Sequence, residues 1–526
     1  MRVAVRADAS TRIGSGHVMR CLTLAQALRE QGAEVRFICR DHPGHMGDRI
    51  KLAGLPVSLL RAPPDSRRPI PDGDYAAWLG VPIDTDAAET ISALDGWRPD
   101  WLVVDHYGLD RAWEQVLRPH VGAILVIDDL ANRAHDCDLL LDQNDHPKPA
   151  ARYDGLVPAA CRRLCGPGYA LLRSEYAATR RQIGPRDGPV ARVLVYYGAT
   201  DPTNETARAL RVLSQPAFRH LLVDVVLGVN APHRDEVVSL ATARPGTTVH
   251  EPRPSLADLM ARADLALGAG GATTWERCCL GLPAIVTAVA ANQGPLATAL
   301  AEGGRAVFLG CHDSVTDDCL SEAVRDLLAV PAKREAIAQA AFALTDGWGA
   351  AKVAEIVVPS DGHDLALRPA EVGDMAQYYF WVNDPSVRAQ AFETEPVPWP
   401  THRAWFRRAL DRASCHMHVL ELKPHVPVGQ VRIEQKGEED VIDYSVDAAM
   451  RGRGWGTRIL VLARQVWDGI GQSRALHGYV KAGNVASQRA FVAAGFTERP
   501  LDSLDSEPGS LHYVYVPENT RETDRR

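Results

Sequence analysis

A histidine stands in the first turn of the first predicted helix, directly after a glycine-rich turn. Gly14 and Gly16 follow the first predicted strand, and glycines there let backbone N–H groups approach an anion closely. The start of a helix adds partial positive charge. His17 titrates near neutrality and could act as a general base. Taken alone, the turn is equally typical of a tight strand-to-helix connection, and a lone histidine is more often structural.

A second turn of small residues lies between Gly268 and Glu276, again where a predicted strand ends. Its threonine hydroxyls can donate hydrogen bonds, and its glutamate could accept them from ribose hydroxyls. A glycine turn with a threonine N-cap is the alternative. Two phosphate-type turns facing one cleft are less expected by chance than either alone. The candidate residues of this signal are Gly270, Gly271, Thr273, Thr274, Glu276, Asn292 and Gln293.

A third glycine-rich segment follows a predicted strand over 440–446 and opens a helix. It consists of Arg451, Gly452, Arg453, Gly454, Trp455 and Gly456. An Arg-x-x-Gly-x-Gly loop in this setting can wrap a pyrophosphate with consecutive backbone N–H groups. Asn484 and Ser487 follow about 30 residues later, which is the helix–strand spacing of such units.

The elements that must position these residues form two series and a separate module. Short β-branched runs alternate with helical periods over 1–178 and again over 190–356. This alternation predicts two parallel sheets covered on both faces, with ligands at the carboxyl ends of the strands. The polar segment 180–188 reads as the linker between the two lobes.

A further boundary is predicted near residues 358–364, where turn-forming residues cluster. Beyond it, helices come first and strands follow, which predicts an α+β domain over 364–516. Residues 61–73 read as a surface loop, and residues 518–526 read as a solvated tail. The predicted strands are 3–6, 34–39, 101–105, 123–128, 191–197, 222–227, 248–250, 265–268, 284–289, 417–422, 428–434, 441–446 and 475–480. The principal predicted helices are 18–31, 110–117, 374–383, 401–412 and 453–469.

Composition and charge exclude several classes of function. The 526 residues carry a formal net charge of -8 and a pI near 6.1, which argues against a general nucleic-acid binder because that needs a basic surface. The charged N-terminus does not resemble a signal peptide, and we find no apolar run of the ~20 residues that a membrane helix requires. Ten cysteines lack paired metal spacing. We therefore expect a reduced, cytoplasmic protein without a metal or membrane partner.

The motifs of the first 350 residues resemble one enzyme family. They are Asp8 with Ser10, Gly14-Ser-Gly-His17 with Arg20, Val104-Asp-His-Tyr-Gly108, Gly166–Arg173, Gly198-Ala-Thr-Asp-Pro202 and Gly270–Glu276. This set resembles the UDP-2,4-diacetamido-2,4,6-trideoxy-β-L-altropyranose hydrolases of pseudaminic acid synthesis. The resemblance implies a glycosyltransferase-B fold of two doubly wound lobes, with UDP bound by residues that include Arg20, Gly198 and Asp201. Ala199 is a departure, because the family often has a second glycine there.

The resemblance assigns the general base to His17, with inversion at the anomeric carbon. UDP leaves as a stabilised anion, so activating water is the main task that remains, and this suits a histidine. Asp105 and Tyr107 end a predicted strand and could shape the sugar pocket. Asp8 could orient the histidine or the water, while Asp105 could equally cap the next turn.

The C-terminal module resembles the GCN5-related N-acetyltransferase (GNAT) superfamily, on the glycine loop, Asn484-x-x-Ser487 and Gly495-Phe496. The resemblance implies acetyl-CoA as co-substrate, with its pyrophosphate in the loop and Asn484 near the pantetheine arm. Residues around Trp381, Asn383, Arg388 and His402 are similar to the branch that acetylates amino sugars and some N-terminal amines, although core packing is the simpler interpretation of the tryptophans.

One departure affects the acetyl transfer. Phe491 occupies a position where many GNAT members carry a tyrosine that protonates the leaving thiolate, and phenylalanine cannot donate. There are three alternatives. Another tyrosine could donate the proton (Tyr444, Tyr479 or Tyr513), solvent could donate it, or the acetyltransferase module is degenerate. Glu434 could deprotonate the amine through water, or it is simply a solvent-facing strand carboxylate.

Both resemblances point to a single pathway, in which a UDP-linked 2,4,6-trideoxy amino sugar is first acetylated on its 4-amine and then released from UDP. The alternatives are a glycosyltransferase with an accessory acetyltransferase, and a sugar-nucleotide sensor with a degenerate acetyltransferase module. Sugar stereochemistry, the acyl group and the oligomeric state are left open by the sequence.

Overall fold

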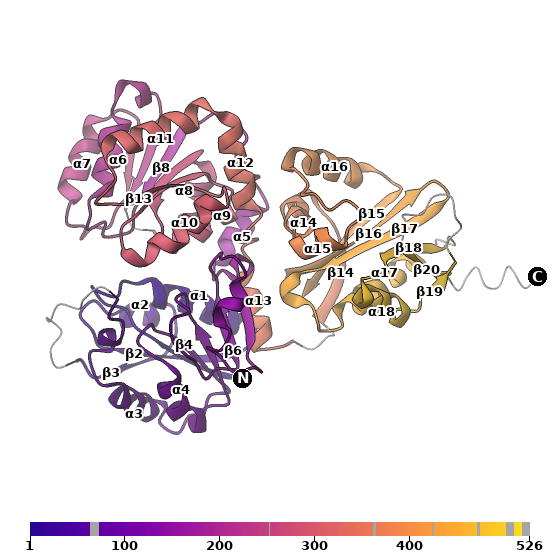
Figure 1. Ribbon diagram of the computed structural model, residues 1–526, viewed down its shortest axis with the longest axis horizontal. Coiled ribbons are helices and arrows are strands. Elements are labelled where there is room, and N and C mark those ends of the chain that lie inside the picture. The colour runs from indigo at the N-terminus through magenta and orange to yellow at the C-terminus, as the bar shows by residue number, and fades with distance from the viewer. Residues whose placement is uncertain are drawn as a thin grey trace, which may run out of the picture. The chain divides into compact units, whose positions relative to one another are not determined.

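The computed structural model describes residues 1–63, 73–251, 253–360, 364–422, 425–470, 474–500 and 510–517. The chain divides into two compact units, Met1–Ser360 and Asp361–Arg526, and Figure 1 shows the elements of each. Most of the predicted loop over 61–73, and the predicted tail over 518–526, lie outside the described residues.

The first lobe of unit 1 is a parallel seven-stranded sheet in the order β3-β2-β1-β4-β5-β6-β7. Its central strands are mostly runs of buried apolar residues, as in Ala-Ile-Leu-Val-Ile of β5, which is typical of parallel strands covered on both faces. The edge strands β3 and β7 are partly exposed. The strands are β1 (Arg2–Ala7), β2 (Glu34–Arg40), β3 (Val57–Leu60), β4 (Trp101–Asp105), β5 (Ala123–Ile127), β6 (Leu139–Asp142) and β7 (Arg162–Cys165). The α-helices are α1 (Gly16–Glu30), α2 (Gly47–Leu52), α3 (Ile83–Leu94), α4 (Arg111–Leu117) and α5 (Ser174–Arg180).

The second lobe repeats this plan with a parallel six-stranded sheet in the order β10-β9-β8-β11-β12-β13. Its strands are β8 (Arg192–Tyr196), β9 (Leu222–Val226), β10 (Thr247–His250), β11 (Leu265–Ala269), β12 (Ala284–Ala288) and β13 (Val307–Cys311). Its α-helices are α6 (Glu205–Leu213), α7 (Arg234–Ala243), α8 (Ala257–Arg262), α9 (Thr273–Cys279), α10 (Gly294–Glu302), α11 (Asp317–Ala329), α12 (Pro331–Phe342) and α13 (Gly349–Val357).

The last helix of unit 1, α13, follows the second lobe in sequence but packs against α1 of the first lobe. Gly349 begins this helix, and a Cβ there would lie 2.3 Å from the Ala170 carbonyl oxygen, so only glycine permits this close approach. The predicted linker is also fixed in place: Arg186 donates to the carbonyl oxygens of Ala263 and Leu280. Unit 1 therefore has its two lobes joined at several points along the chain.

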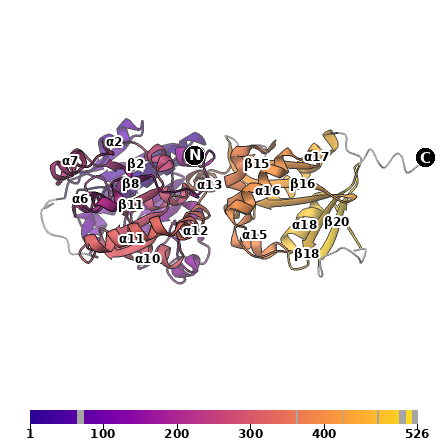
Figure 2. The same cartoon turned by 90° about the horizontal axis from the view of Figure 1, so that it is seen from above.

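Unit 2 is an α+β domain with a seven-stranded sheet in the order β14-β15-β16-β17-β18-β20-β19. Only β17 and β18 pair in parallel, and the remaining pairs are antiparallel. Its strands are β14 (Leu365–Pro369), β15 (Cys415–Leu422), β16 (Val426–Lys436), β17 (Glu439–Val446), β18 (Leu476–Lys481), β19 (Thr497–Arg499) and β20 (Ser510–Tyr515). Its α-helices are α14 (Met375–Val382), α15 (Pro385–Gln390), α16 (Trp399–Asp411), α17 (Trp455–Gly469) and α18 (Val485–Ala493), of which the last two pack against each other (Figures 1 and 2).

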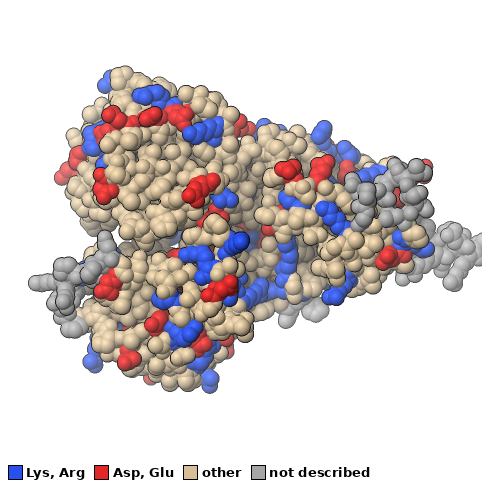
Figure 3. Space-filling view, viewed as in Figure 1, with Lys and Arg blue, Asp and Glu red and all other residues tan. Residues whose placement is uncertain are grey.

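The predicted fold class is confirmed: a glycosyltransferase-B-like pair of doubly wound lobes precedes an α+β domain. On the face shown in Figure 3, both basic and acidic side chains are present. Among the described residues, the helices all fall short of the length and apolar character needed to cross a membrane.

Candidate active sites

The first candidate site lies at the carboxyl ends of β1 and β4, where the strand order of the first lobe reverses. The chain leaves β1 through the Gly14 turn, whose φ of 80° favours glycine, and Gly16 begins α1. Helix α1 buries Val18, Cys21, Leu24, Ala25 and Leu28 at helical spacing. His17 and Arg20, one turn apart on α1, thus reach the last residue of β4, Asp105. Ligands bind at such reversal points in doubly wound sheets.

Asp105 holds both basic side chains of α1. Its Oδ1 lies 2.6 Å from Nδ1 of His17, and Arg20 donates from Nε to Oδ2 at 2.6 Å and from Nη2 to Oδ1 at 2.7 Å. Burial raises the pKa of the Asp105 carboxyl, but the charges of Arg20 and His17 outweigh burial and hold that pKa well below its usual value. An ionised Asp105 accepts a hydrogen bond from Nδ1–H, so Nε2 of His17 is the nitrogen that can take a proton.

Asp129 forms a second acidic centre beside the first. Its Oδ2 accepts hydrogen bonds of 2.6 Å from both Arg20 Nη1 and the Tyr107 hydroxyl, and its Oδ1 accepts one of 2.9 Å from Asn144 Nδ2. The sequence did not single out Asp129 or Asn144. In the sequence, only their places could have indicated a role: Asp129 comes shortly after β5, and Asn144 shortly after β6 of the same sheet.

Aromatic side chains surround the imidazole of His17. The Tyr107 ring packs edge-on to it with centroids 4.6 Å apart, and the Trp78 ring lies 6.0 Å away. Tyr75 extends this wall by packing against both Tyr107 and Trp78. Trp78 belongs to the 3₁₀ helix η1 (Ala76–Leu79), and Tyr75 directly precedes it. The wall gives the histidine an apolar surface on one side.

Among the described residues, Asp8 forms no hydrogen bond or ion pair with His17. Its carboxylate instead pairs with Arg6 at 2.6 and 2.9 Å, and accepts from the backbone N–H of Arg40 at 2.6 Å. His106 lies behind it, with Nε2 3.5 Å from Asp8, and burial lowers the pKa of this histidine to about 3. The carboxylate that orients the histidine is thus Asp105, whereas Asp8 belongs to a buried network that joins β1 to β2. The oxygens of Asp105 are held by His17 and Arg20, and the cap of the following helix α4 is Asp110.

The second candidate site lies at the matching reversal point of the second lobe, between β8 and β11. Gly270 and Gly271 follow β11, and a Cβ on either would lie within 3.3–3.7 Å of Gln293. Gln293 Oε1 accepts from the backbone N–H of Val289, and Asn292 precedes it in the 3₁₀ helix η6 (Ala291–Gln293). The predicted small and amide residues are therefore brought together at one loop cluster.

Arg277, which the sequence did not single out, lies beneath this loop. It is buried, and it donates to Thr273 Oγ1 at 3.2 Å, Thr274 Oγ1 at 3.1 Å and the Ala269 carbonyl oxygen at 2.8 Å. Both hydroxyl oxygens accept from Arg277, so each hydroxyl keeps its hydrogen for donation elsewhere. A donor-rich loop backed by a cation is suited to an anion.

The remaining predicted residues of this lobe are Glu276, Gly198 and Asp201, and each has a different environment. Burial raises the pKa of the Glu276 carboxyl to about 7, although a hydrogen bond with Tyr176 opposes the increase. Gly198, two residues after the end of β8, has a φ of 108°. Asp201 is buried and accepts from the backbone N–H groups of Glu205 and Thr206, so its oxygens fix the first turn of α6.

In unit 2 the predicted loop connects β17 to α17. Gly452 and Gly454 have φ values of 80° and 77°, and Gly454 is the N-cap of the 15-residue helix. The first turn of a helix leaves N–H groups without intrahelical partners. Arg451 donates from Nε to the Val446 carbonyl oxygen and from Nη1 to Ser386 Oγ, so it anchors the loop, while the Arg453 guanidinium lies 5.4 Å from the Trp455 ring centroid.

The other predicted cofactor residues meet this loop around one tyrosine. The Tyr444 hydroxyl lies 3.1 Å from Ser487 Oγ, and a Cβ on Gly456 would lie 3.6 Å from the same hydroxyl. Asn484 accepts from the Ser487 N–H and thereby caps α18. β17 and β18 pair only at Asp440–Leu476 and Val441–His477. Beyond those pairs β17 is no longer bonded to β18, and Tyr444 remains paired only with Val431 of β16 on its other side.

The three alternative donors to Phe491 have different partners. Tyr479 donates to Glu439 Oε2 at 2.6 Å, and Tyr513 donates to Glu498 Oε2 at 3.4 Å while stacking on Phe491. Tyr444 has the Ser487 hydroxyl as its partner, and burial raises its pKa. Of the three, Tyr444 is the one beside the glycine loop.

Three further sequence candidates in unit 2 have structural partners. Trp381 is buried and donates from Nε1 to Asp447, and His402 is buried with Nε2 2.9 Å from the Met375 carbonyl oxygen. The core-packing interpretation of Trp381 is therefore confirmed. Glu434 accepts from Arg412 at 2.7 Å.

Comparison with known proteins gives separate matches. Residues 364–497 match the sequence model of the acetyltransferase (GNAT) domain family. The chain is 31% identical over 176 residues to the UDP-2,4-diacetamido-2,4,6-trideoxy-beta-L-altropyranose hydrolase of Campylobacter jejuni, which covers 34% of this chain and 53% of the relative. It is 27% identical over 193 residues to the spore coat polysaccharide biosynthesis protein SpsG of Bacillus subtilis, 36% of this chain and 57% of the relative.

An uncharacterized protein of Methanocaldococcus jannaschii is 20% identical over 509 residues, 94% of this chain and 96% of the relative. The match to the hydrolase and to SpsG thus spans about half the length of each, whereas the archaeal protein is similar over nearly the whole chain. Both resemblances predicted from the sequence are confirmed, including the fusion of an acetyltransferase domain to a part related to sugar-nucleotide enzymes. The GNAT match supports the use of acetyl-CoA.

Proposed function

We propose that the chain is a bifunctional enzyme of pseudaminic acid biosynthesis. Residues 1–178 and 190–356 hydrolyse UDP-2,4-diacetamido-2,4,6-trideoxy-β-L-altropyranose to the free sugar and UDP. Residues 364–516 acetylate the 4-amine of the UDP-amino-sugar precursor with acetyl-CoA. The observation that carries the proposal is the contact between His17 and Asp105 at the reversal point of the first sheet.

In the hydrolysis, His17 activates water. Nε2 accepts a proton while the water oxygen bonds to the anomeric carbon, and the bond from that carbon to the UDP oxygen breaks with its electron pair going to UDP. Attack from the face opposite the leaving group inverts the configuration. Asp105 stabilises the imidazolium that forms, because it is ionised and 2.6 Å from Nδ1.

The second lobe stabilises the departing diphosphate. Thr273 and Thr274 donate their hydroxyl hydrogens, and the charge of Arg277 beneath them favours an anion at the loop. Gly270 and Gly271 allow backbone N–H groups to approach the phosphates. Glu276 accepts from the ribose hydroxyls.

In the acetyl transfer, the loop from Arg451 to Gly456 holds the pyrophosphate of acetyl-CoA, which supplies the acetyl thioester. The glycines fit this role, because Gly452 and Gly454 leave the space around their Cα atoms open. The amine nitrogen bonds to the thioester carbonyl carbon, and the carbon–sulfur bond breaks with its electron pair going to sulfur. Tyr444 gives its hydroxyl proton to that thiolate in place of the family's tyrosine, since Phe491 cannot, and regains a proton, through solvent, from the ammonium group that the attack creates. Ser487 orients that hydroxyl.

The test is a mass-spectrometric time course with UDP-4-amino-4,6-dideoxy-N-acetyl-β-L-altrosamine and acetyl-CoA. We expect an acetylated UDP-sugar first, followed by free diacetamido sugar and UDP without any added acceptor. Accumulation of the acetylated UDP-sugar would contradict the hydrolase, and UDP release that depends on an acceptor would indicate a glycosyltransferase.

The His17→Ala variant separates the two activities. It should retain acetyl transfer at the wild-type rate and lose UDP release, because only the hydrolysis needs a base at this position. Unchanged UDP release in the variant would exclude His17 from the mechanism. Absence of acetylation in both proteins would indicate a degenerate acetyltransferase domain.

A further inference from the structure

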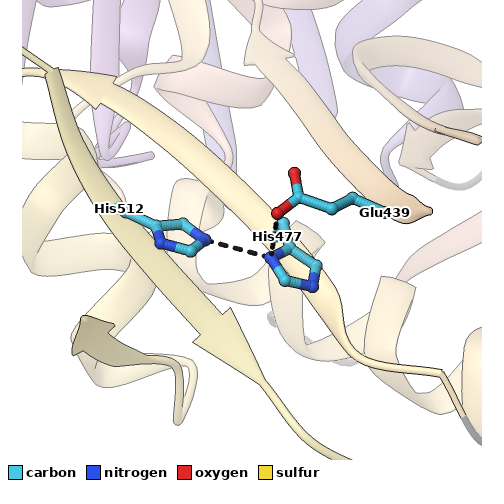
Figure 4. A group of neighbouring side chains, drawn as sticks. All are labelled: Glu439, His477 and His512. Atoms are coloured by element: carbon cyan, nitrogen blue, oxygen red, sulfur yellow. Dashed lines mark hydrogen bonds and ion pairs between the residues drawn. The ribbon is translucent and has the colours of Figure 1, made fainter. Parts of the chain in front are cut away.

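Three strands of unit 2 bring one carboxylate and two imidazoles together (Figure 4). Glu439 begins β17, His477 lies on β18 and His512 lies on β20. Val441 of β17 is paired with His477, and Tyr479 of β18 is opposite His512. Side chains two residues apart on a strand share a face, so the register places all three groups on one face of the sheet.

We propose that Glu439, His477 and His512 form a binding site for a divalent transition-metal ion, best matched by Zn²⁺. Nδ1 of His477 lies 3.0 Å from Nε2 of His512 and 3.3 Å from Oε1 of Glu439, and the three ligand atoms all lie within 4.8 Å of one another. A tetrahedral zinc ion with bonds of about 2.0–2.1 Å has neighbouring ligand atoms roughly 3.3 Å apart. The two spacings to His477 therefore suit a single ion, and the third pair of ligand atoms, on Glu439 and His512, lies within 4.8 Å.

The chemistry of the donors favours the same class of ion. Two imidazole nitrogens and one carboxylate oxygen form a borderline ligand set that suits zinc and the neighbouring late transition metals, rather than Ca²⁺ or Mg²⁺. The two ring nitrogens lie 3.0 Å apart, which is also hydrogen-bond distance. An ion about 2.0–2.1 Å from each nitrogen would lie to one side of the line that joins them and would replace the shared hydrogen. Three protein ligands leave a fourth position for water.

A supporting shell holds two of the ligands in place. Tyr479 donates its hydroxyl to Glu439 Oε2 at 2.6 Å, which leaves Oε1 directed at His477. The Tyr479 ring also stacks on His512 with centroids 4.8 Å apart and an interplanar angle of 4°. Outer-shell contacts of this kind fix ligand orientation in metal sites. All three ligands are half-buried, so an ion can reach them.

The site lies where β17 and β18 are still paired, next to the point at which they separate. An ion bound there would link β17, β18 and β20 beside the last paired residues of β17 and β18. No metal site was predicted from the sequence, because Glu439, His477 and His512 lie far apart in the chain and fit no short spacing motif.

The test measures zinc binding to the untagged full-length protein after removal of metals with a chelator. Mass spectrometry of the metal content after dialysis should give one Zn²⁺ per chain, with a thermal transition that rises on zinc addition and falls back with EDTA. His477→Ala, His512→Gln and Glu439→Gln should each lower affinity at least tenfold, and Tyr479→Phe should lower it about 10–100-fold. His425→Ala removes an exposed histidine near Glu421 and should bind as the wild type does.

Other results would overturn the proposal. The first is a wild-type protein that binds no zinc. The second is one zinc ion per chain retained by the folded His512→Gln and Glu439→Gln variants. Cobalt substitution gives a second readout. The Co²⁺ protein should show visible bands of a four-coordinate nitrogen and oxygen site, whereas a sulfur-to-cobalt charge-transfer band would place the ion on cysteines instead.

Discussion

At the scale of single residues, the charge of Asp105 determines which nitrogen of His17 can act as a base. We expect Asp105→Asn to lower kcat of UDP-sugar hydrolysis by about 10²–10⁴-fold, because a neutral amide no longer fixes the Nδ1–H tautomer. UDP affinity should fall by much less than kcat: Asp105 also holds Arg20, which the resemblance assigns to UDP, but the threonine loop of the second lobe keeps its contacts with the diphosphate. Steady-state kinetics and UDP binding by calorimetry would check both.

The chain offers two controls for this variant. Acetyl transfer by the same protein should be unchanged, and Asp110→Asn in the same lobe should hydrolyse normally, because asparagine caps a helix as well as aspartate does. A fall in hydrolysis that matches a fall in the fraction of folded protein would assign Asp105 a structural role only.

The Tyr444 hydroxyl is the proton donor that we assign to the acetyl transfer. Tyr444→Phe should lower kcat of that reaction by about 100-fold and leave KM for acetyl-CoA within about twofold, because the hydroxyl acts on the leaving thiolate. The release of free thiol can be followed with a thiol reagent. Tyr513→Phe, whose hydroxyl contacts Glu498, is the matched control, and equal losses in both variants would contradict the assignment.

At the scale of elements, the first turn of α6 contains a buried acid. Glu205 is 1% exposed, and neither of its oxygens has a hydrogen-bond partner in the described part of the chain, although Oε1 lies 3.4 Å from Arg208 Nη2. Burial outweighs the charge of Arg208 and raises the pKa of Glu205 to about 7. A raised carboxyl pKa means that the folded state binds the proton more tightly. This contribution to stability is fully present below the unfolded pKa, near 4.5, and is lost as the pH rises through about 7.

Glu205→Gln removes this pH dependence. The variant should be more stable than the wild type at pH 8 by roughly 1–3 kcal/mol, and the two proteins should converge toward pH 5. Thermal unfolding over this pH range is the measurement. If the difference in unfolding free energy between the two proteins stays constant with pH, Glu205 is ionised in the folded state.

The central elements could be predicted from the sequence because their apolar runs are long. The strand over 101–105 has the same bounds in the structure, and most other predicted strands differ by one or two residues. The strands β3, β6, β7, β13, β14 and β19 are absent from the predicted set, because each is only three to five residues long and shows little periodic pattern. His17 was found from its turn, but Asp129, Arg277 and the ligands of the proposed metal site act through contacts that only the folded sheets create.

At the scale of the whole molecule, the two compact units have separate sheets and separate candidate sites. We expect scanning calorimetry to resolve two unfolding transitions. UDP should raise only the transition of unit 1 and CoA only that of unit 2, because a ligand stabilises the unit that binds it. At 100 times Kd the gain is about 2.7 kcal/mol.

The Gly454→Val variant tests which transition belongs to which ligand. Its β-branched side chain strains a residue with φ of 77° in the loop assigned to the pyrophosphate, so the CoA-induced shift should disappear while the UDP-induced shift persists. His17→Ala should keep both shifts, because the base contacts neither nucleotide in the proposed mechanism. A single transition raised by both ligands would contradict two independently stable units, and a CoA shift that survives in the Gly454 variant would place CoA elsewhere.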